Sequence, residues 1–226
     1  MAIAAGDAGI YSDDFEGAEW VSAQPPTSDV NWDFDELASS GTIDISSGAV
    51  VIDLPGGTTR TWYDSARACP VLRQGCTDAD FEVTLKLADL PTTQGEEVYL
   101  YASNTDETEA YSAGFYYDTS FVRSATDHVG GSEPYGVASS LTAPCYLRLV
   151  WDTAANTLAC WSSQDGTTWT SAYYTHTGLT TFVPLYVGVV VGTFNGNANV
   201  RTFDYFYEAA GEIGGAGPTR RVMVIS

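Results

Sequence analysis

The chain has 226 residues, 44% of them hydrophobic, and its 29 carboxylates against nine basic side chains give a formal net charge of −20. A chain this acidic repels phosphate backbones and anionic lipid, which argues against nucleic acid and membrane surfaces as partners. Fourteen Tyr, nine Phe, six Trp and 22 Gly favour strands and tight turns, and no apolar run reaches the roughly 18 residues that a membrane span needs.

The surplus of carboxylates has two interpretations. It keeps the protein soluble, or it adapts the protein to high salt or divalent cations, where carboxylates stay hydrated or bind metal. Lys86 is the only lysine. The composition leaves both interpretations open.

The length and composition predict one all-β domain, because sandwiches of this size often remain undivided. We expect an N-terminal arm at residues 1–10, a two-sheet antiparallel jelly-roll β-sandwich at residues 11–208, and a Gly-rich linker with a C-terminal tail at residues 209–226. Residues 1–10 have no basic region and no long apolar segment, so they do not form a signal peptide. We therefore expect an extracellular protein that is released by lysis or by assembly into a particle, such as a virion surface.

Strand-like segments separated by Gly, Asp, Asn, Ser and Pro clusters recur along the chain. Alternation of apolar and polar residues is clearest in Phe81–Leu87 and Tyr146–Trp151, which predicts strands with one buried face. Three long stretches are expected to be irregular, at residues 23–38, 56–78 and 124–143. The expected strands are Thr42–Ile45, Val50–Leu54, Phe81–Leu87, Val98–Ala102, Ala113–Tyr117, Tyr146–Trp151, Thr157–Ser162, Leu185–Val191 and Val200–Tyr207.

The four cysteines form two pairs along the sequence. Cys69 and Cys76 bracket a short segment with Pro and Gly, which predicts a local disulfide. Cys145 and Cys160 lie on adjacent expected strands and on their apolar side. They form either a cross-strand disulfide or two buried thiols.

Three segments together resemble the concanavalin A-like lectin and glucanase superfamily. They are YSDDFEG at residues 11–17, the strand–turn–strand segment at residues 146–170, and RTFDYFYE at residues 201–208. In that superfamily a DDF-type first strand pairs with an FDxF-type last strand and closes a jelly roll. The resemblance implies the fold, but lectins, glucanases, lyases and structural modules all use it.

The segment SQDGTTW, at residues 163–169, is similar to the Asp box of sialidases but one residue shorter. The resemblance implies that Asp165 caps backbone N–H groups of a turn and that Trp169 covers the hairpin. Both residues are therefore assigned to folding.

A retaining glucanase of this superfamily would carry two carboxylates at alternate positions of one strand, about 5–5.5 Å apart. The nearest sequence match is Asp78-x-Asp80-x-Glu82, which departs from the E-x-D-x-E pattern. The other acidic candidates, Asp33, Asp35 and Glu36, suit a helix cap or calcium equally well. We therefore expect no enzymatic activity.

A structural Ca²⁺ is implied by the resemblance, at the place where the first and last strands meet. Its candidate ligands are Glu16, Gly17 and Asp204. No other cofactor is expected.

Aromatic and polar side chains away from the apolar faces suggest a glycan-binding surface, because sugar C–H faces pack on flat rings while polar groups bond the hydroxyls. The alternative is that the tyrosines simply pack the sandwich. The candidates are Trp32, Trp62, Tyr63, Tyr99, Tyr101, Tyr116, Tyr146 and Arg148.

The C-terminal tail suits attachment to a protein partner, by adding a strand to the edge of the partner's sheet. Its candidate contacts are Arg220, Arg221, Val222, Val224 and Ile225. The sequence thus predicts a non-enzymatic surface module, in an oligomer or larger assembly, that binds glycan or a host surface. The alternatives are a structural shell or fibre protein without sugar binding and a secreted glycoside hydrolase.

Overall fold

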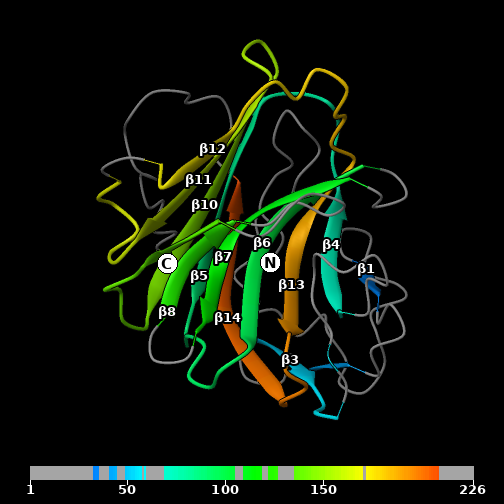
Figure 1. Ribbon diagram of the computed structural model, residues 1–226. Helices are drawn as coiled ribbons and strands as arrows, with labels where there is room; N and C mark the ends of the chain where they lie inside the picture. The colour runs from blue at the N-terminus through cyan, green and yellow to red at the C-terminus, as the bar shows by residue number, and fades with distance from the viewer. Residues whose placement is uncertain are drawn as a thin grey trace, which may run out of the picture.

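The computed structural model describes residues 33–35, 41–44, 49–57, 59, 69–104, 109–118, 122–126, 135–169 and 172–208. Within these ranges the chain forms strands and no helix, arranged as two seven-stranded sheets (Figure 1). The strand pairs within each sheet are antiparallel. The expected all-β, two-sheet antiparallel sandwich is confirmed. The described residues include no helix able to cross a membrane.

Strands in chain order cross repeatedly between the two sheets, as in a jelly roll. The first sheet has the order β1 (Asp33–Asp35), β4 (Val71–Gly75), β13 (Tyr186–Thr193), β6 (Glu96–Ser103), β7 (Ala110–Tyr117), β8 (Val122–Thr126) and β9 (Tyr135–Ala138). The second sheet has the order β12 (Tyr174–His176), β11 (Thr157–Ser163), β10 (Cys145–Asp152), β5 (Phe81–Leu87), β14 (Asn199–Glu208), β3 (Val50–Leu54) and β2 (Thr42–Asp44).

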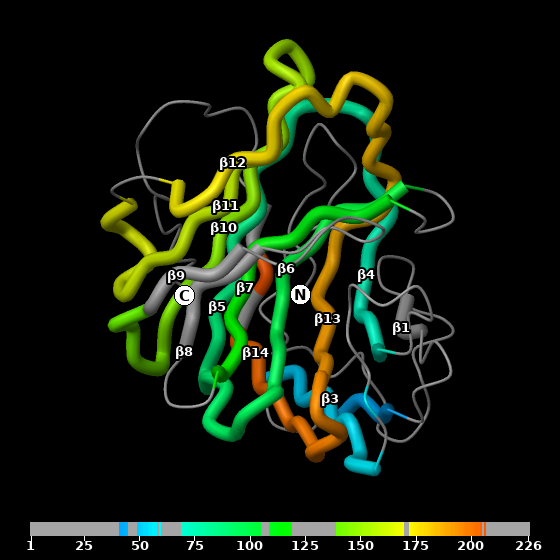
Figure 2. Tube along the Cα trace, in the orientation of Figure 1, coloured from blue at the N-terminus to red at the C-terminus, as the bar shows by residue number. Residues whose placement is uncertain are grey.

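The core lies between the sheets and follows from period-two alternation. Phe81, Val83, Leu85 and Leu87 of β5 all face it, as the sequence predicts. The late strands β13 and β14, coloured orange in Figure 2, run among strands from the first half of the chain. Strand β14 is paired with β3 on one side and β5 on the other. The last described strand therefore closes the second sheet.

Several strands lie where irregular chain was expected, and β4 is the most important of them. Leu72 and Gln74 of β4 point toward the core, whereas Val71 and Arg73 point away from it. Each face thus carries one apolar and one polar residue, which conceals the alternation in the sequence. Strand β8 overlaps the start of the stretch 124–143 and β9 lies within it, and at five and four residues both are too short for a clear alternation.

Buried polar side chains fasten β14 of the second sheet to the first sheet. Arg201 forms an ion pair with Glu96 at the start of β6, and these residues are 4% and 7% exposed. Asn199 donates from its Nδ2 to the carbonyl oxygens of Glu97, at 2.9 Å, and Gly192, at 2.6 Å. A buried pair that is also hydrogen-bonded favours one relative placement of the strands, because misplacement would leave its charges unpaired.

The segment at residues 163–169 folds as its Asp-box resemblance implies. Asp165 accepts hydrogen bonds from the backbone N–H groups of Thr168, at 2.7 Å, and Thr167, at 2.8 Å. Trp169 donates from its Nε1 to the carbonyl oxygen of Gly166 at 3.1 Å. The structural role assigned to Asp165 and Trp169 is confirmed.

The structure contradicts the expected Cys69–Cys76 disulfide, because all four cysteines are free and buried. Cys69 and Cys76 flank the five-residue strand β4, which sets their Cα atoms on the order of 20 Å apart, whereas a disulfide needs less than about 7 Å. On the paired strands β10 and β11, Cys160 lies opposite Leu149 rather than opposite Cys145. The alternative of two buried thiols at Cys145 and Cys160 is the correct one.

The buried thiols should be unreactive in the folded protein. Burial, with a smaller contribution from Asp78, raises the pKa of Cys76 to about 12, and burial with Asp89 raises the pKa of Cys145 to about 12. Because the thiolate is the reactive form, Ellman's reagent should label four thiols in denaturant and almost none under native conditions. A reducing agent should leave the melting temperature unchanged, and a drop of several degrees would contradict the absence of disulfides.

The Asp165 turn should make stability depend on pH. Hydrogen bonds from the backbone of Thr168 and Thr167 hold the pKa of Asp165 well below its usual range. The stabilisation is fully present above the unfolded-state pKa of about 3.9 and is lost as pH falls toward the lower folded-state pKa. Asp165→Ala should therefore lower the melting temperature at pH 7, and the difference from wild type should narrow between pH 4 and pH 2. Asp53→Ala, at an exposed position of β3, is the control; an Asp165 difference that stays constant to pH 2 would refute this account.

Candidate functional site

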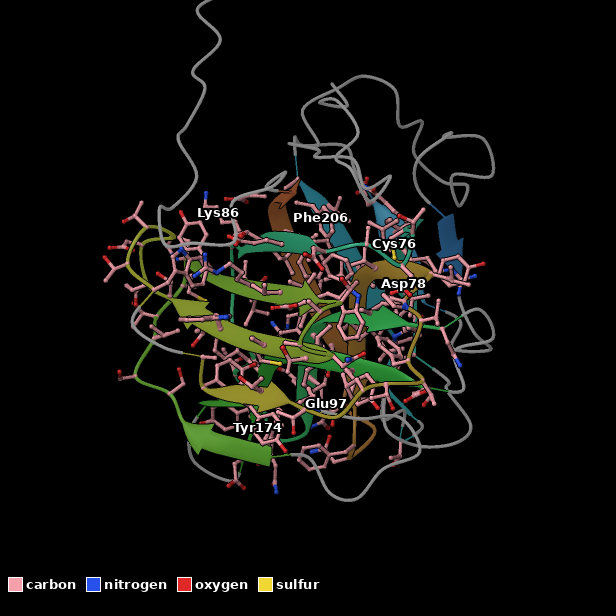
Figure 3. The ribbon with its side chains drawn as sticks, turned by 90° about the horizontal axis from the view of Figure 1, so that it is seen from above. Cys76, Asp78, Lys86, Glu97, Tyr174 and Phe206 are labelled. Carbon is pink, nitrogen blue, oxygen red and sulfur yellow. The ribbon has the colours of Figure 1, made fainter. Side chains whose placement is uncertain are left out.

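The first sheet has an inner face toward the core and an outer face on its other side. Val98, Leu100 and Ala102 of β6 point inward. The alternate residues of β6 therefore occupy the outer face, and they are Glu97, Tyr99, Tyr101 and Ser103. Figure 3 shows Glu97 in the first sheet and Lys86 in the second, well apart on the two layers.

The outer face holds a second buried cluster centred on two tyrosines that the sequence singled out. Tyr99 and Tyr101 are 1% and 0% exposed, and the half-buried Tyr116 packs against their cluster. The remaining members of this cluster are Cys69, Val71, Ala110 and Val190. The structure thus brings three of the sequence-predicted aromatic residues together on one face.

Small residues stand beside these tyrosines on the neighbouring strands. Tyr101 lies opposite Ser112 on β7 and Gly188 on β13, and Tyr99 lies opposite Gly114 on β7. A Cβ atom at Gly114 would lie 2.1 Å from the carbonyl oxygen of Val98. One at Gly188 would lie 2.2 Å from the carbonyl oxygen of Leu72. Close strand approach therefore requires glycine at both positions.

Polar groups are buried on the same face. Glu97 is 2% exposed, and Ser103 and Ser112 are fully buried. Burying polar groups costs free energy unless hydrogen bonds replace those made to water. Because these groups are buried, any contact with a sugar falls to the half-buried side chains of the same face, such as Tyr116.

The β4–β13 side of the outer face is less buried than its centre. The guanidinium carbon of Arg73 lies 4.5 Å from the ring centroid of Tyr186, and both side chains are half-buried. The strand register places Asp33 of β1 opposite Arg73. Neither Arg73 nor Tyr186 was predicted as a site residue. Val187 and Val189 face the core at every second position, and this pattern in the sequence indicates that Tyr186 faces outward.

Three acidic residues occupy positions on this face. Asp33 and Asp35 lie opposite Arg73 and Val71, and Glu97 lies on β6. Strands β6 and β1 are three steps apart in the sheet, about 14 Å, which is too far for a hydrolytic carboxylate pair of about 5–9.5 Å. Asp33 and Asp35 stand at alternate positions of β1, so their Cα atoms are about 7 Å apart.

The carboxylates of the Asp78-x-Asp80-x-Glu82 triplet have structural partners instead. Asp78 accepts a hydrogen bond from Nε1 of Trp151 at 3.3 Å, and Asp80 accepts one from the backbone N–H of Thr153 at 2.8 Å. Glu82 pairs with Arg148 at 2.8 Å. These contacts support the interpretation of the triplet as part of the fold.

Arg148, a glycan candidate from the sequence, lies on the second sheet and is 9% exposed. Its guanidinium carbon lies 4.0 Å from the ring centroid of Trp169 and 5.0 Å from that of Trp161. Together with the ion pair to Glu82, this stacking holds the side chain under the Asp-box hairpin. Tyr146 stands next to it, half-buried beneath Gly166.

The calcium site remains a prediction. Asp204 forms an ion pair with Lys86, and its two proposed co-ligands, Glu16 and Gly17, lie outside the described residues. Among the residues that the structure describes, no three His, Cys, Asp or Glu side chains gather as metal ligands would.

Other predicted contacts also fall outside the described ranges. These are Trp32, Trp62 and Tyr63 among the glycan candidates, and Arg220, Arg221, Val222, Val224 and Ile225 of the tail. They too remain predictions.

The chain was compared with protein families, curated proteins and solved structures. No family model and no curated protein matches it. Among solved structures, it is similar to the GH43 BlXynB protein from Bacillus licheniformis, with a TM-score of 0.67 and 16% identity over 88% of this chain and 39% of that one. It is also similar to a bifunctional GH43-CE protein from Bacteroides eggerthii, with a TM-score of 0.66 and 15% identity over 88% of this chain and 26% of that one.

A third similar structure is the xylan beta-1,4-xylosidase from Bacillus halodurans C-125, with a TM-score of 0.60 and 15% identity over 87% of this chain and 38% of that one. The chain thus spans 26–39% of the length of these three proteins. At such identities the likeness establishes a fold found in glycoside hydrolases. This finding contradicts the expectation of a non-enzymatic protein, because the solved structures that share the fold are GH43 proteins and a xylosidase.

Proposed function

We propose that the chain acts on polysaccharides as a domain of the glycoside hydrolase type, and that the outer face of the first sheet holds the glycan. The observation that carries this proposal is the composition of that face. It points away from the core, and beside the buried Tyr99 and Tyr101 it carries the half-buried Tyr116 and the half-buried Tyr186 with the Arg73 guanidinium over its ring. Rings with adjacent hydrogen-bonding groups suit the two-sided chemistry of a sugar.

Xylan-type polysaccharide is the substrate class to test first. One similar structure is a xylan beta-1,4-xylosidase, and another is an engineered GH43 enzyme with endo-xylanase and exo-arabinofuranosidase activity. The net charge of −20 also favours a neutral chain over an anionic one.

For hydrolysis, we propose Asp33 and Asp35 as the acid pair. A spacing of about 7 Å fits the inverting mechanism, in which one carboxyl group protonates the oxygen of the glycosidic bond as that bond breaks. The other carboxylate takes a proton from a water molecule, and that water attacks the anomeric carbon from the opposite face of the sugar. Alternate positions on one strand place the two residues on one face, which is the arrangement this step requires.

Binding should depend on the outer face of the first sheet. We expect the chain to bind xylo-oligosaccharides in isothermal titration calorimetry, and Tyr116→Ala to weaken binding three- to tenfold, the scale of one aromatic contact. Thr175→Ala, at an exposed position of β12 in the second sheet, should bind as the wild type does. A wild-type chain that neither binds nor cleaves xylan, arabinan or xyloglucan would overturn the proposed function.

Hydrolysis should depend on the acid pair. Reducing-sugar release from xylan by the wild type should fall at least 100-fold in Asp33→Asn and in Asp35→Asn, since each loses one carboxylate of the pair. Asp80→Asn, which changes the capped turn at Thr153, is the matched control and should retain activity. Equal activity in all four proteins would remove Asp33 and Asp35 from the mechanism.

A further inference from the structure

Tyr186 differs from the other tyrosines of the outer face in its surroundings. It is the first residue of β13 and lies opposite Gly75 on β4 and Ser103 on β6. Tyr99 and Tyr101 are buried, whereas Tyr186 is half-buried. Its ring therefore stands between two small residues at a part of the face that solvent reaches.

Gly75 is a glycine that neither backbone nor packing explains. Its φ is not positive, unlike that of Gly57, Gly95, Gly166, Gly178 and Gly196. A Cβ atom at Gly75 would meet no atom of a described residue within 4 Å, whereas one at Gly188 would lie 2.2 Å from a backbone oxygen. Glycine weakens a strand by giving up backbone entropy and side-chain contacts, and in strands it often marks a place where a ligand approaches closely.

Arg73 lies beside Gly75 and Tyr186 on the outer face, and these three residues together are called the corner. Arg73 lies two positions before Gly75 on the same face of β4, with its guanidinium over the Tyr186 ring at 4.5 Å. A cation held against an aromatic face is fixed in orientation, and a guanidinium presents several N–H donors in one plane. The corner thus combines a flat ring, a donor group and open space beside Gly75.

We propose that the Arg73–Gly75–Tyr186 corner is a sugar-binding subsite of this face. A sugar ring packs its C–H face on the part of the Tyr186 ring that Arg73 leaves uncovered, beside Gly75, and Arg73 donates hydrogen bonds to its hydroxyl groups. This rests on the proposed function, and it assigns the glycan's point of contact to the β4–β13 side rather than to the buried centre at Tyr99 and Tyr101.

The subsite should take a neutral sugar rather than a uronic acid. The strand register places Asp33 of β1 opposite Arg73. The chain as a whole carries −20 charges, which repel an anionic ligand. Binding of a neutral oligosaccharide should also change little with salt, because no ion pair forms.

Gly75→Thr is the decisive variant. A β-branched residue should preserve or raise the melting temperature, because it favours a strand and meets no atom, yet it fills the space beside Tyr186. We expect it to weaken xylohexaose binding at least tenfold in titration calorimetry, and Gly75→Ala to weaken binding less. Ala159→Thr, the same kind of substitution on β11 of the second sheet, should leave the affinity unchanged.

Variants of Tyr186 test the stacking separately. Tyr186→Phe keeps the ring and should bind nearly as the wild type does, whereas Tyr186→Leu keeps apolar volume without a flat ring and should lose most of the affinity. If the wild type binds xylohexaose and a folded Gly75→Thr binds equally well, the subsite is refuted while the proposed function stands. Tighter binding of a uronate-bearing oligosaccharide than of xylohexaose would refute its neutral specificity. A wild type that binds no glycan would overturn the proposed function and the subsite together.

Discussion

The fold depends on strand β6, which is buried along its whole length and on both of its faces. Its inward residues Val98, Leu100 and Ala102 belong to the main core, and its outward residues Tyr99 and Tyr101 form the centre of the second cluster. Its first residue, Glu96, holds Arg201 of the opposite sheet. A single strand thereby contributes to the core, to the candidate site and to the ion pair between the sheets, so a shift of its register would disturb all three.

Close packing around β6 also decides where the outer face is filled and where it is open. Beside it, Gly114 and Gly188 are glycines because adjacent backbones leave no room for a Cβ atom. Farther out, Gly75 is a glycine with open space around it. Glycine thus occurs in one sheet in two opposite settings, with no room for a Cβ atom at Gly114 and Gly188 and with unfilled space at Gly75. Only the setting of Gly75 leaves a surface that a ligand can enter.

Several basic side chains of the chain have a partner within the fold. Lys86, Arg148 and Arg201 each pair with a carboxylate. Arg73 stacks on Tyr186 and stands opposite Asp33 in the register. Lys86, Arg148 and Arg201 are therefore engaged in holding the fold, and the surplus of carboxylates sets the field around the protein. Such a field suits a neutral polysaccharide better than an anionic one.

The Asp-box hairpin shows how a functional-looking motif can serve the fold alone. Trp169 and Arg148 are residue types often found at binding surfaces, yet here the guanidinium is stacked under the indole and paired with Glu82. The motif ties the hairpin down over β10 and β11 through Asp165 and its two backbone donors. The chemistry proposed for glycans lies instead on the other sheet.

The sequence by itself determined the all-β class, the strands whose alternation is clean, such as Phe81–Leu87, and the Asp165 turn, because these depend on residues close together in the chain. It also identified Tyr99, Tyr101 and Tyr116, but it did not show that they share one cluster. Tertiary structure alone decided the strand β4, whose faces mix polar and apolar residues, and the separation of cysteines that seemed paired. The tertiary structure also determined that Gly75 lies opposite Tyr186 on the neighbouring strand. Register between strands distant in the chain is set by packing against the whole core, and no local periodicity records it.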